Sequence, residues 1–374
     1  MEAFIESTIG RIQPHSTEWK KKAVDRVSQL TMPYWALGRL LDLGVDLVAM
    51  TRSLSPRFEK KAVFILASDH GVTQEGVSLY PKEVTLQMVK NFMSQTAAIH
   101  ALCRPVGAQV VIADFGVDGD LSEFSSTGRL WDYKIGHGTE NFAEGPAMTR
   151  NQALQSVRFG MDLVFQHQHE VDVFAAGEMG IGNTTASAAV ASVLLDVPVE
   201  RIVGRGTGLN DAQLMHKVEV VKRALKRNQP QRADPWDVLA RVGGFEIGGL
   251  AGMILAAASL QKPWVMDGYI ASTAALIAQA LCPWSMDYVI ASHQSQEQGH
   301  RLILDYLGKK PLLDLALRLG EGSGAALALN FVEAAVRVIT ETATFESAQV
   351  STAHSSSLST SAKPAVVGME RSSE

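Results

Sequence analysis

Short apolar runs alternate with longer amphipathic segments through the middle of the chain. Runs of strand length occupy residues 62–67, 110–113, 171–176, 264–266 and 288–291. Apolar residues at helical spacing, three or four positions apart, cover residues 83–93, 149–167, 186–195 and 248–259. Because apolar strands that alternate with helices form parallel sheets with crossover helices, the pattern predicts an α/β core.

Both ends of the chain have a helical pattern instead. Residues 20–30, with capping residues at Ser16 and Thr17, and residues 37–49 predict two helices near the N-terminus. Near the other end, residues 311–319 and 325–338 predict two more, and Ser and Ala then dominate. We therefore expect N-terminal helices over 1–60, an α/β core over 61–310, C-terminal helices with a Gly-rich loop over 311–348, and a mobile Ser-rich tail over 349–374.

Glycine and polar residues follow each apolar run. The segments that follow are SDHG at 68–71, DFGVD at 114–118, GEMG at 177–180, DG at 267–268 and SH at 292–293. In open parallel sheets, ligands bind outside the carboxyl ends of the strands. These segments therefore predict where an active site lies.

The composition excludes several classes of protein. Of the 374 residues, 46% are apolar and 20% are charged, which supports a sizeable core and excludes wholesale disorder. The net charge of -5 argues against general nucleic-acid binding, because phosphate contacts need a surplus of Lys and Arg. We see neither a signal-peptide pattern nor an apolar stretch long enough to cross a bilayer, so we expect no membrane span and a cytoplasmic location. Cys103 and Cys282 lack disulfide or metal-ligand spacing, and we expect them to be buried.

Two glycine-rich segments have the features of phosphate-binding turns. GEMGIGNTTAS at 177–187 joins a strand to a helix, and VGRGTGLND at 203–211 precedes a helix that carries Lys217. Glycines let the backbone approach a ligand, and the N–H groups and dipole at a helix start favour an anion. Alternatively, the first segment is a tight capped turn and Lys217 a solvated surface residue. The pairing of the two segments favours a mononucleotide or sugar phosphate.

A third glycine-rich segment, GEGSGA at 320–325, places Glu321 at a helix start. A carboxylate preorganised there suits a general base, most of all if burial raises its pKa. The competing interpretation is a glutamate that only stabilises the helix dipole. Glu178 is a second carboxylate in a similar setting. His70 and His293 lack metal-ligand partners at the usual spacing, so we expect hydrogen-bonding roles. Hydrolase and NAD-dehydrogenase motifs are missing from the sequence.

Six segments together resemble the nicotinate-nucleotide–dimethylbenzimidazole phosphoribosyltransferase family. They are residues 68–88, 141–150 (NFAEGPAMTR), 178–187, 203–211, 242–249 (VGGFEIGG) and 320–325, in order and with family-like spacing. The resemblance runs from about residue 5 to residue 350. It implies a Rossmann-like parallel sheet flanked by helices, a smaller helical domain built from both chain ends, and a homodimer.

The resemblance also implies a reaction without a metal or cofactor. Nicotinate mononucleotide gives its 5-phosphoribosyl group to 5,6-dimethylbenzimidazole, with inversion at the anomeric carbon, in making the lower-ligand nucleotide of cobalamin. Carried over by motif, Glu321 is the general base and Glu178 lies near the ribose. The residues implied for the nucleotide's phosphate and ribose are Gly180, Gly182, Asn183, Thr184, Gly206, Thr207, Gly208, Lys217 and Ser295. Those implied for the acceptor base are Ser78, Tyr80, Gln87, Met88 and Leu319.

Some alternatives stay open. In the family pattern a small hydroxyl precedes the proline and an amide follows about a turn later, whereas here Tyr80 precedes Pro81 and Gln87 adjoins Met88. Another benzimidazole, a purine or a phenol therefore remains an alternative acceptor. A transferase that uses phosphoribosyl diphosphate is a second possibility. Such an enzyme would ordinarily need Mg²⁺ and two adjacent acidic residues after a strand, and the sequence has no such acidic pair. A catalytically silent nucleotide-binding relative is the third possibility.

Overall fold

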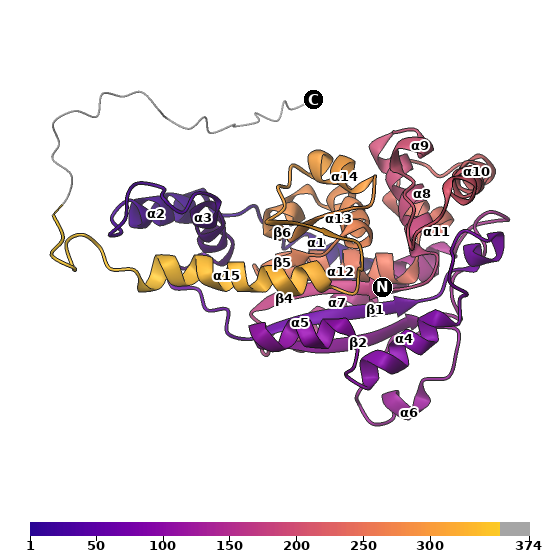
Figure 1. Cartoon of the computed structure of the whole chain (residues 1–374), viewed down its shortest axis with the longest axis horizontal. Helices are drawn as coiled ribbons and strands as arrows, with labels where there is room; N and C mark the ends of the chain where they lie inside the picture. The colour runs from indigo at the N-terminus through magenta and orange to yellow at the C-terminus, as the bar shows by residue number, and fades with distance from the viewer. Residues whose placement is uncertain (352–374) are drawn as a thin grey trace.

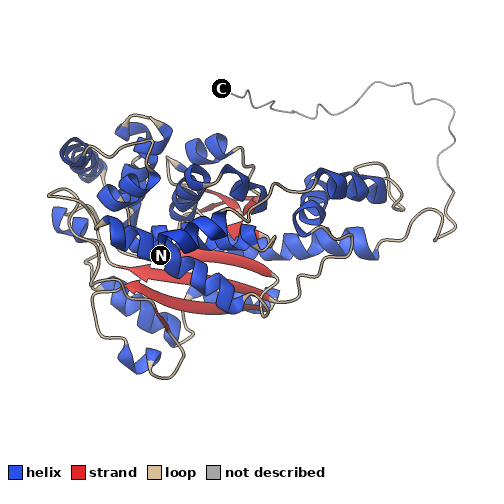
Figure 2. Cartoon of the chain, turned by 180° about the vertical axis from the view of Figure 1, so that it is seen from behind, coloured by secondary structure: helices blue, strands red, loops and turns tan. Residues whose placement is uncertain are grey.

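The computed structural model describes residues 1–351, so the predicted tail at 349–374 lies outside the described residues apart from its first positions. A six-stranded parallel sheet forms the centre (Figures 1 and 2). Its strands are β1 (Lys61–Ser68), β2 (Ala108–Gly116), β3 (Trp131–Asp132), β4 (Val173–Met179), β5 (Trp264–Met266) and β6 (Val289–Ala291). All five predicted strands are confirmed, with small shifts in their ends.

The strand order is β3-β2-β1-β4-β5-β6, and every neighbouring pair is parallel. This is the Rossmann order, in which successive strands are added first on one side of β1 and then on the other, so that the strand order reverses between β1 and β4. The loops that leave the carboxyl ends of β1 and β4 run to opposite sides and open a crevice between them. The topology therefore places a ligand site beyond Ser68 and Met179.

Helices cover both faces of the sheet. α7 (Arg150–His167) and α12 (Phe245–Ser259) pack on one face, and α5 (Ala98–Val106) and α15 (Ser323–Glu341) lie on the other (Figures 1 and 2). Every residue of β1 and β4 is buried, as expected for strands covered on both sides. α7 and α12 approach closely at Gly160, where a side chain would clash with the Gly249 carbonyl. The absence of a Cβ at this position therefore permits the contact.

One predicted helix is wrong. Residues 311–319 contain a strand, β8 (Leu313–Leu317), which pairs in parallel with β7 (His293–Ser295) in a separate two-stranded sheet. Leu313, Leu315 and Leu317 alternate with shorter residues, which is the period of a strand. The backbone of this segment bonds to the β6–β7 region, with the Leu313 N–H donating to the Ser292 carbonyl at 2.9 Å.

Two of the N-terminal helices pack with the C-terminal part of α15. α2 (Thr17–Val27) begins at the predicted cap, where the Ser16 hydroxyl accepts the Trp19 N–H at 3.3 Å. α2 and α3 (Arg39–Thr51) pack against the C-terminal part of α15 in a separate apolar cluster that includes Val27, Val45 and Ile339. Figure 1 shows α15 running from the sheet to these two helices. The exact domain boundaries at 60 and 310 stay a prediction.

Among the described residues, α15 alone is long and apolar enough, by length and composition, to cross a membrane, and more than half of it is buried inside the protein. Such burial is what a core helix requires. Cys103 and Cys282 are free and buried, as predicted. The other helices are α1 (Glu2–Ile9), α4 (Val84–Met93), α6 (Ser122–Ser125), α8 (Asn183–Leu195), α9 (Val199–Ile202), α10 (Asp211–Asn228), α11 (Pro235–Val242), α13 (Tyr269–Leu281), α14 (His300–Leu307) and the 3₁₀ helices η1 (Gly71–Glu75) and η2 (Pro283–Tyr288).

Candidate functional site

A cavity of about 420 Å³ lies at the carboxyl ends of the central strands. Segments from all three glycine-rich turns contribute to its wall. The wall is formed by Tyr80, Val84, Met88, Glu178, Met179, Gly180, Ile181, Asn183, Thr184, Gly206, Thr207, Asp267, Gly268, Tyr269, Ile270, His293, Ser295, Glu297, Arg318, Leu319, Gly320 and Glu321. The fold thus brings together residues that are more than 200 positions apart.

The first glycine-rich turn connects β4 to the start of α8. A Cβ at Gly180 would clash with the Ser68 carbonyl, so glycine is needed where the turn passes the end of β1. Gly182 has a φ of 99° and caps α8, which leaves the N-terminus of this helix at the site. The Ile181 N–H donates to the Thr85 hydroxyl at 3.1 Å, which ties the turn to α4.

The second turn meets the first through Lys217. This lysine of α10 is 1% exposed, and its Nζ donates to the Thr184 hydroxyl at 2.8 Å. Burial lowers the pKa of Lys217 to about 8, although the charge of Glu297 opposes this. The interpretation of Lys217 as a solvated surface residue is therefore wrong. The two turns and a buried cation form one donor-rich corner of the cavity.

The third turn has an unusual backbone. Gly320, Glu321 and Gly322 have φ angles of 82°, 59° and 74°, three successive left-handed residues. The Asp267 carboxylate accepts the N–H groups of Gly322, Gly324 and Ala325 at 3.1, 2.8 and 3.0 Å, which anchors the start of α15. Strain of this kind is retained where the surroundings over-determine the backbone, and it is concentrated at functional sites.

Burial alters the acidity of both predicted catalytic glutamates. Burial, together with the charge of Asp267, raises the pKa of Glu321 to about 7. Burial also raises the pKa of Glu178 to about 8, and the charges of Glu246 and Asp267 add to the effect. The Asn183 amide donates to Glu178, which partly offsets this rise. Carboxyl groups that titrate near neutral pH in a cavity are candidates for proton transfer.

His70 has the hydrogen-bonding role that we expected. Its Nε2 lies 2.8 Å from Glu246 Oε1, and both side chains are fully buried. Within residues 1–351, no group of three or more His, Cys, Asp and Glu side chains could hold a metal ion.

The predicted acceptor residues divide into two sets. Tyr80, Met88 and Leu319 line the cavity, and the side chains of Tyr80 and Leu319 are about half exposed. Ser78 and Gln87 are not part of its wall: the Ser78 hydroxyl accepts the Tyr80 N–H at 3.2 Å, and Gln87 is exposed on α4. Gly182, Gly208 and Lys217 are not part of its wall either.

Several residues that line the cavity were not predicted from the sequence to belong to the site. Asp267 and His293 were visible only as polar residues that follow apolar runs. Glu297 gave no signal, because it lies in an irregular loop between β7 and α14. Its importance comes from its neighbour Lys217, which is distant in sequence.

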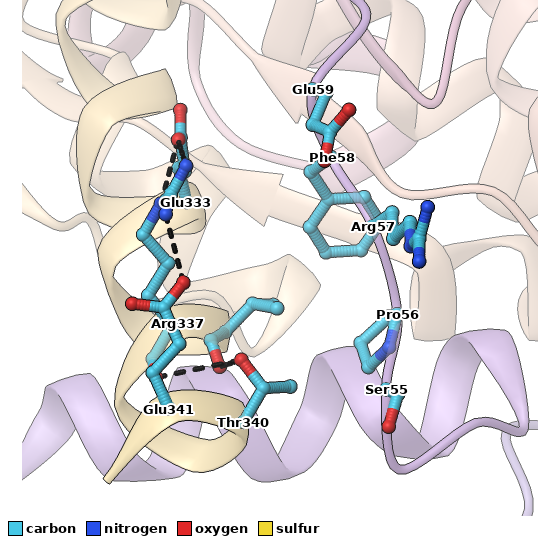
Figure 3. Close-up of a pocket in the computed structure, with 10 residues that line it drawn as sticks. Ser55, Pro56, Arg57, Phe58, Glu59, Glu333, Arg337, Thr340 and Glu341 are labelled. Atoms are coloured by element: carbon cyan, nitrogen blue, oxygen red, sulfur yellow. Dashed lines mark hydrogen bonds and ion pairs between the residues drawn. The ribbon is translucent and has the colours of Figure 1, made fainter.

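A second pocket lies near the amino end of the central strand β1, at the other end of the strand from the first cavity (Figure 3). Residues 55–59 and the outer half of α15 line it, next to Lys61 at the start of β1. Its charged groups on α15 pair with one another: Arg337 contacts Glu333 and Glu341, each at 2.8 Å, and Lys61 also pairs with Glu333. We therefore assign the candidate site to the first cavity.

Comparisons with known proteins agree with this geometry. A family model described as Phosphoribosyltransferase matches residues 12–350. The chain is 51% identical to the nicotinate-nucleotide–dimethylbenzimidazole phosphoribosyltransferase of Syntrophotalea carbinolica, over 93% of this chain and 99% of the relative. It is 48% identical to the enzyme of that name from Geobacter sulfurreducens, over 93% and 98%. The crystal structure of CobT from Thermus thermophilus matches with a TM-score of 0.86 and 42% identity, over 90% of this chain and 100% of that one. The chain therefore belongs to the nicotinate-nucleotide–dimethylbenzimidazole phosphoribosyltransferase family.

Proposed function

We propose that the protein transfers the 5-phosphoribosyl group of nicotinate mononucleotide to 5,6-dimethylbenzimidazole, forming α-ribazole 5′-phosphate and nicotinate. Relatives with this name cover nearly the whole chain. The observation that carries the proposal is that Glu321 and Glu178, whose pKa values are raised to about 7 and 8, share one cavity with two glycine-rich turns.

The reaction needs one proton acceptor. The bond between C1′ and the pyridinium nitrogen breaks, and nicotinate leaves with a neutral ring nitrogen, so no acid is required. One benzimidazole nitrogen attacks C1′ from the opposite face and inverts it, while the other nitrogen loses its proton. Glu321 accepts that proton, and a pKa of about 7 suits a base that works near neutral pH.

The other carboxyl groups favour positive charge on the ribose. Glu246, Asp267 and Glu321 all raise the pKa of Glu178, which means that this corner of the cavity has a negative potential. The same potential stabilises the cationic ribose as the pyridinium departs. In this proposal Gly180, Gly182, Asn183, Thr184, Gly206, Thr207, Gly208, Lys217 and Ser295 hold the phosphate and ribose.

The acceptor wall supports a flat aromatic ring without specifying one base. Tyr80, Val84, Met88, Ile270 and Leu319 supply mainly apolar surface. A different lower-ligand base, such as another benzimidazole, a purine or a phenol, is therefore the second candidate acceptor. The homodimer implied by the resemblance and the cytoplasmic location expected from the sequence both stay predictions.

The test is to incubate the protein with nicotinate mononucleotide and a panel of bases, with EDTA present, and to identify products by mass. We expect a base ribotide and free nicotinate with 5,6-dimethylbenzimidazole. A reaction without nicotinate mononucleotide but with phosphoribosyl diphosphate is the control. Product only from the diphosphate and only with Mg²⁺, or no ribotide with any base, would contradict the proposal.

A further inference from the structure

Glu297 places a carboxyl group against the groups that the proposed function assigns to phosphate. Its Oε2 occupies the space where a Cβ of Gly204 would lie, at the base of the second glycine-rich turn. That oxygen is buried and has no hydrogen-bond partner among the described residues. A Cβ on Gly206, two residues further along the turn, would lie 3.5 Å from Lys217 Nζ. The carboxylate and the lysine therefore both lie beside this turn.

The charges around Glu297 are those of an anion site. Burial raises the pKa of Glu297, whereas the charge of Lys217, the Gly206 N–H and the charge of Arg318 act in the opposite direction. Lys217, the Gly206 N–H and Arg318 therefore all favour the ionised form of this carboxyl. The charge of Glu297 in turn helps to raise the pKa of the Tyr269 phenol. Lys217 in turn has Glu297 as the counter-charge that offsets its burial. The groups closest in effect to Glu297 are thus cations and a backbone N–H, which are the partners that an anion needs.

The surroundings also offer the Glu297 side chain another position. Glu297 lines the main cavity and an adjoining cavity of about 440 Å³, and Gly206 and Arg318 also line both. The side chain therefore forms part of the partition between the two cavities. Arg205 and Arg318 also line the outer cavity, so cations are present on that side of the partition.

We propose that the Glu297 carboxylate stands in for the substrate's phosphate in the empty site and must withdraw from Lys217 and Gly206 when the nucleotide binds. The inference rests on the proposed function, because it takes these two residues as the phosphate site. Two anions cannot share one buried cation without a large repulsive cost. Glu297 therefore weakens nucleotide binding while it keeps the buried Lys217 compensated between turnovers.

The test compares Glu297→Gln with the unmodified protein by calorimetric binding of inorganic phosphate and of nicotinate mononucleotide. Glutamine keeps the size of the side chain and removes its charge. We expect both ligands to bind more tightly, on the order of tenfold, and the KM for the nucleotide to fall without a matching fall in kcat. Loss of a merely structural residue would weaken binding instead. Glu297→Ala also removes the carboxylate and gives a second measurement if the first variant is unstable.

Two further variants separate the possible outcomes. Glu200→Gln removes an exposed carboxylate that pairs with Lys222 outside the cavity, so we expect it to leave affinity unchanged. Lys217→Met removes the cation and should weaken binding of both ligands. If Lys217→Met weakens binding and Glu297→Gln leaves it unchanged or weaker, the inference about Glu297 fails and the phosphate site stands. If neither variant changes affinity, the phosphate binds elsewhere, and the inference fails together with that part of the proposed function.

Discussion

Two glutamates near α15 have pKa values that are shifted in opposite directions. The pKa of Glu321 is raised to about 7 by burial and by Asp267. The pKa of Glu333, a few turns into the helix, is lowered mainly by its hydrogen bond from Lys61. A glutamate at the start of a helix would ordinarily be stabilised in its ionised form by the helix dipole. At Glu321, loss of solvent and a neighbouring like charge outweigh that effect.

We predict that Glu321→Gln retains nucleotide binding and loses most turnover, by about 10²–10⁴-fold, as is typical when a general base is removed. In the unmodified protein, kcat should rise with pH through about 7, because the base works only when deprotonated. Steady-state kinetics and nucleotide binding across this pH range check both statements. Glu341→Gln, which changes an exposed carboxylate at the other end of α15, is the control and should retain normal kinetics. Near-normal turnover of Glu321→Gln would remove the base assignment.

At the scale of elements, each glycine-rich turn is held by a partner that is distant in sequence. Thr85 of α4 accepts from the β4–α8 turn, Thr184 of α8 accepts from Lys217 of α10, and Asp267 after β5 holds the start of α15. Each turn is therefore held in place by a partner elsewhere in the fold and not by local bonds alone. Preorganisation of this kind is what catalysis by positioning requires.

Asp267→Asn tests the most connected of these attachments. An asparagine can keep the bonds at Oδ1, but it leaves the Gly322 N–H opposite an amide N–H₂. We expect the free energy of unfolding, measured in denaturant, to fall by about 1–3 kcal/mol, the usual effect of one unsatisfied buried group. Loss of the like charge should also lower the pKa of Glu321, so the rise of kcat with pH should move to lower pH. Asp314→Asn, on the exposed strand β8, is the matched control. An unmoved pH profile would contradict the electrostatic coupling.

At the scale of the whole molecule, α15 connects the candidate site to two of the N-terminal helices. Its start carries the Glu321 turn, and its last turns pack with α2 and α3 in a cluster of their own. Figure 1 shows this helix bridging the two parts. The family model matches up to residue 350, just beyond this region.

We predict that a chain ending at residue 351 keeps both its kcat and its unfolding midpoint. The remaining residues are rich in Ser and Ala and offer little apolar surface for packing. Parallel kinetics and thermal unfolding of the full and shortened chains check this. A clear loss of activity on truncation would show that the tail contributes to the enzyme.

Local sequence patterns predict most helices and strands correctly. They fail where pairing with a segment distant in sequence decides the conformation. The pattern predicts β5 with both its ends and α7 within one residue, because apolar period and capping are local properties. The pattern also predicts a helix over residues 311–319, because the leucines at 312, 315 and 319 have helical spacing. The leucines at 313, 315 and 317 have the two-residue spacing of a strand and fit equally well. Pairing with β7 decided between the two. The motif places Ser78 and Gln87 in the acceptor set, and the course of α4 decided which side chains reach the cavity.

By itself, the sequence determined the parallel α/β core, the three glycine-rich turns, the positions of Glu178 and Glu321, and the family. These properties depend on residues close together in the chain, or on motifs in order along it. Only the tertiary structure decided that Lys217 is buried, that burial raises the pKa values of the two glutamates to about 7 and 8, and that the charge of Glu297 acts on the lysine. Burial and electrostatic potential are sums over all neighbours in space, and most of those neighbours are distant in sequence.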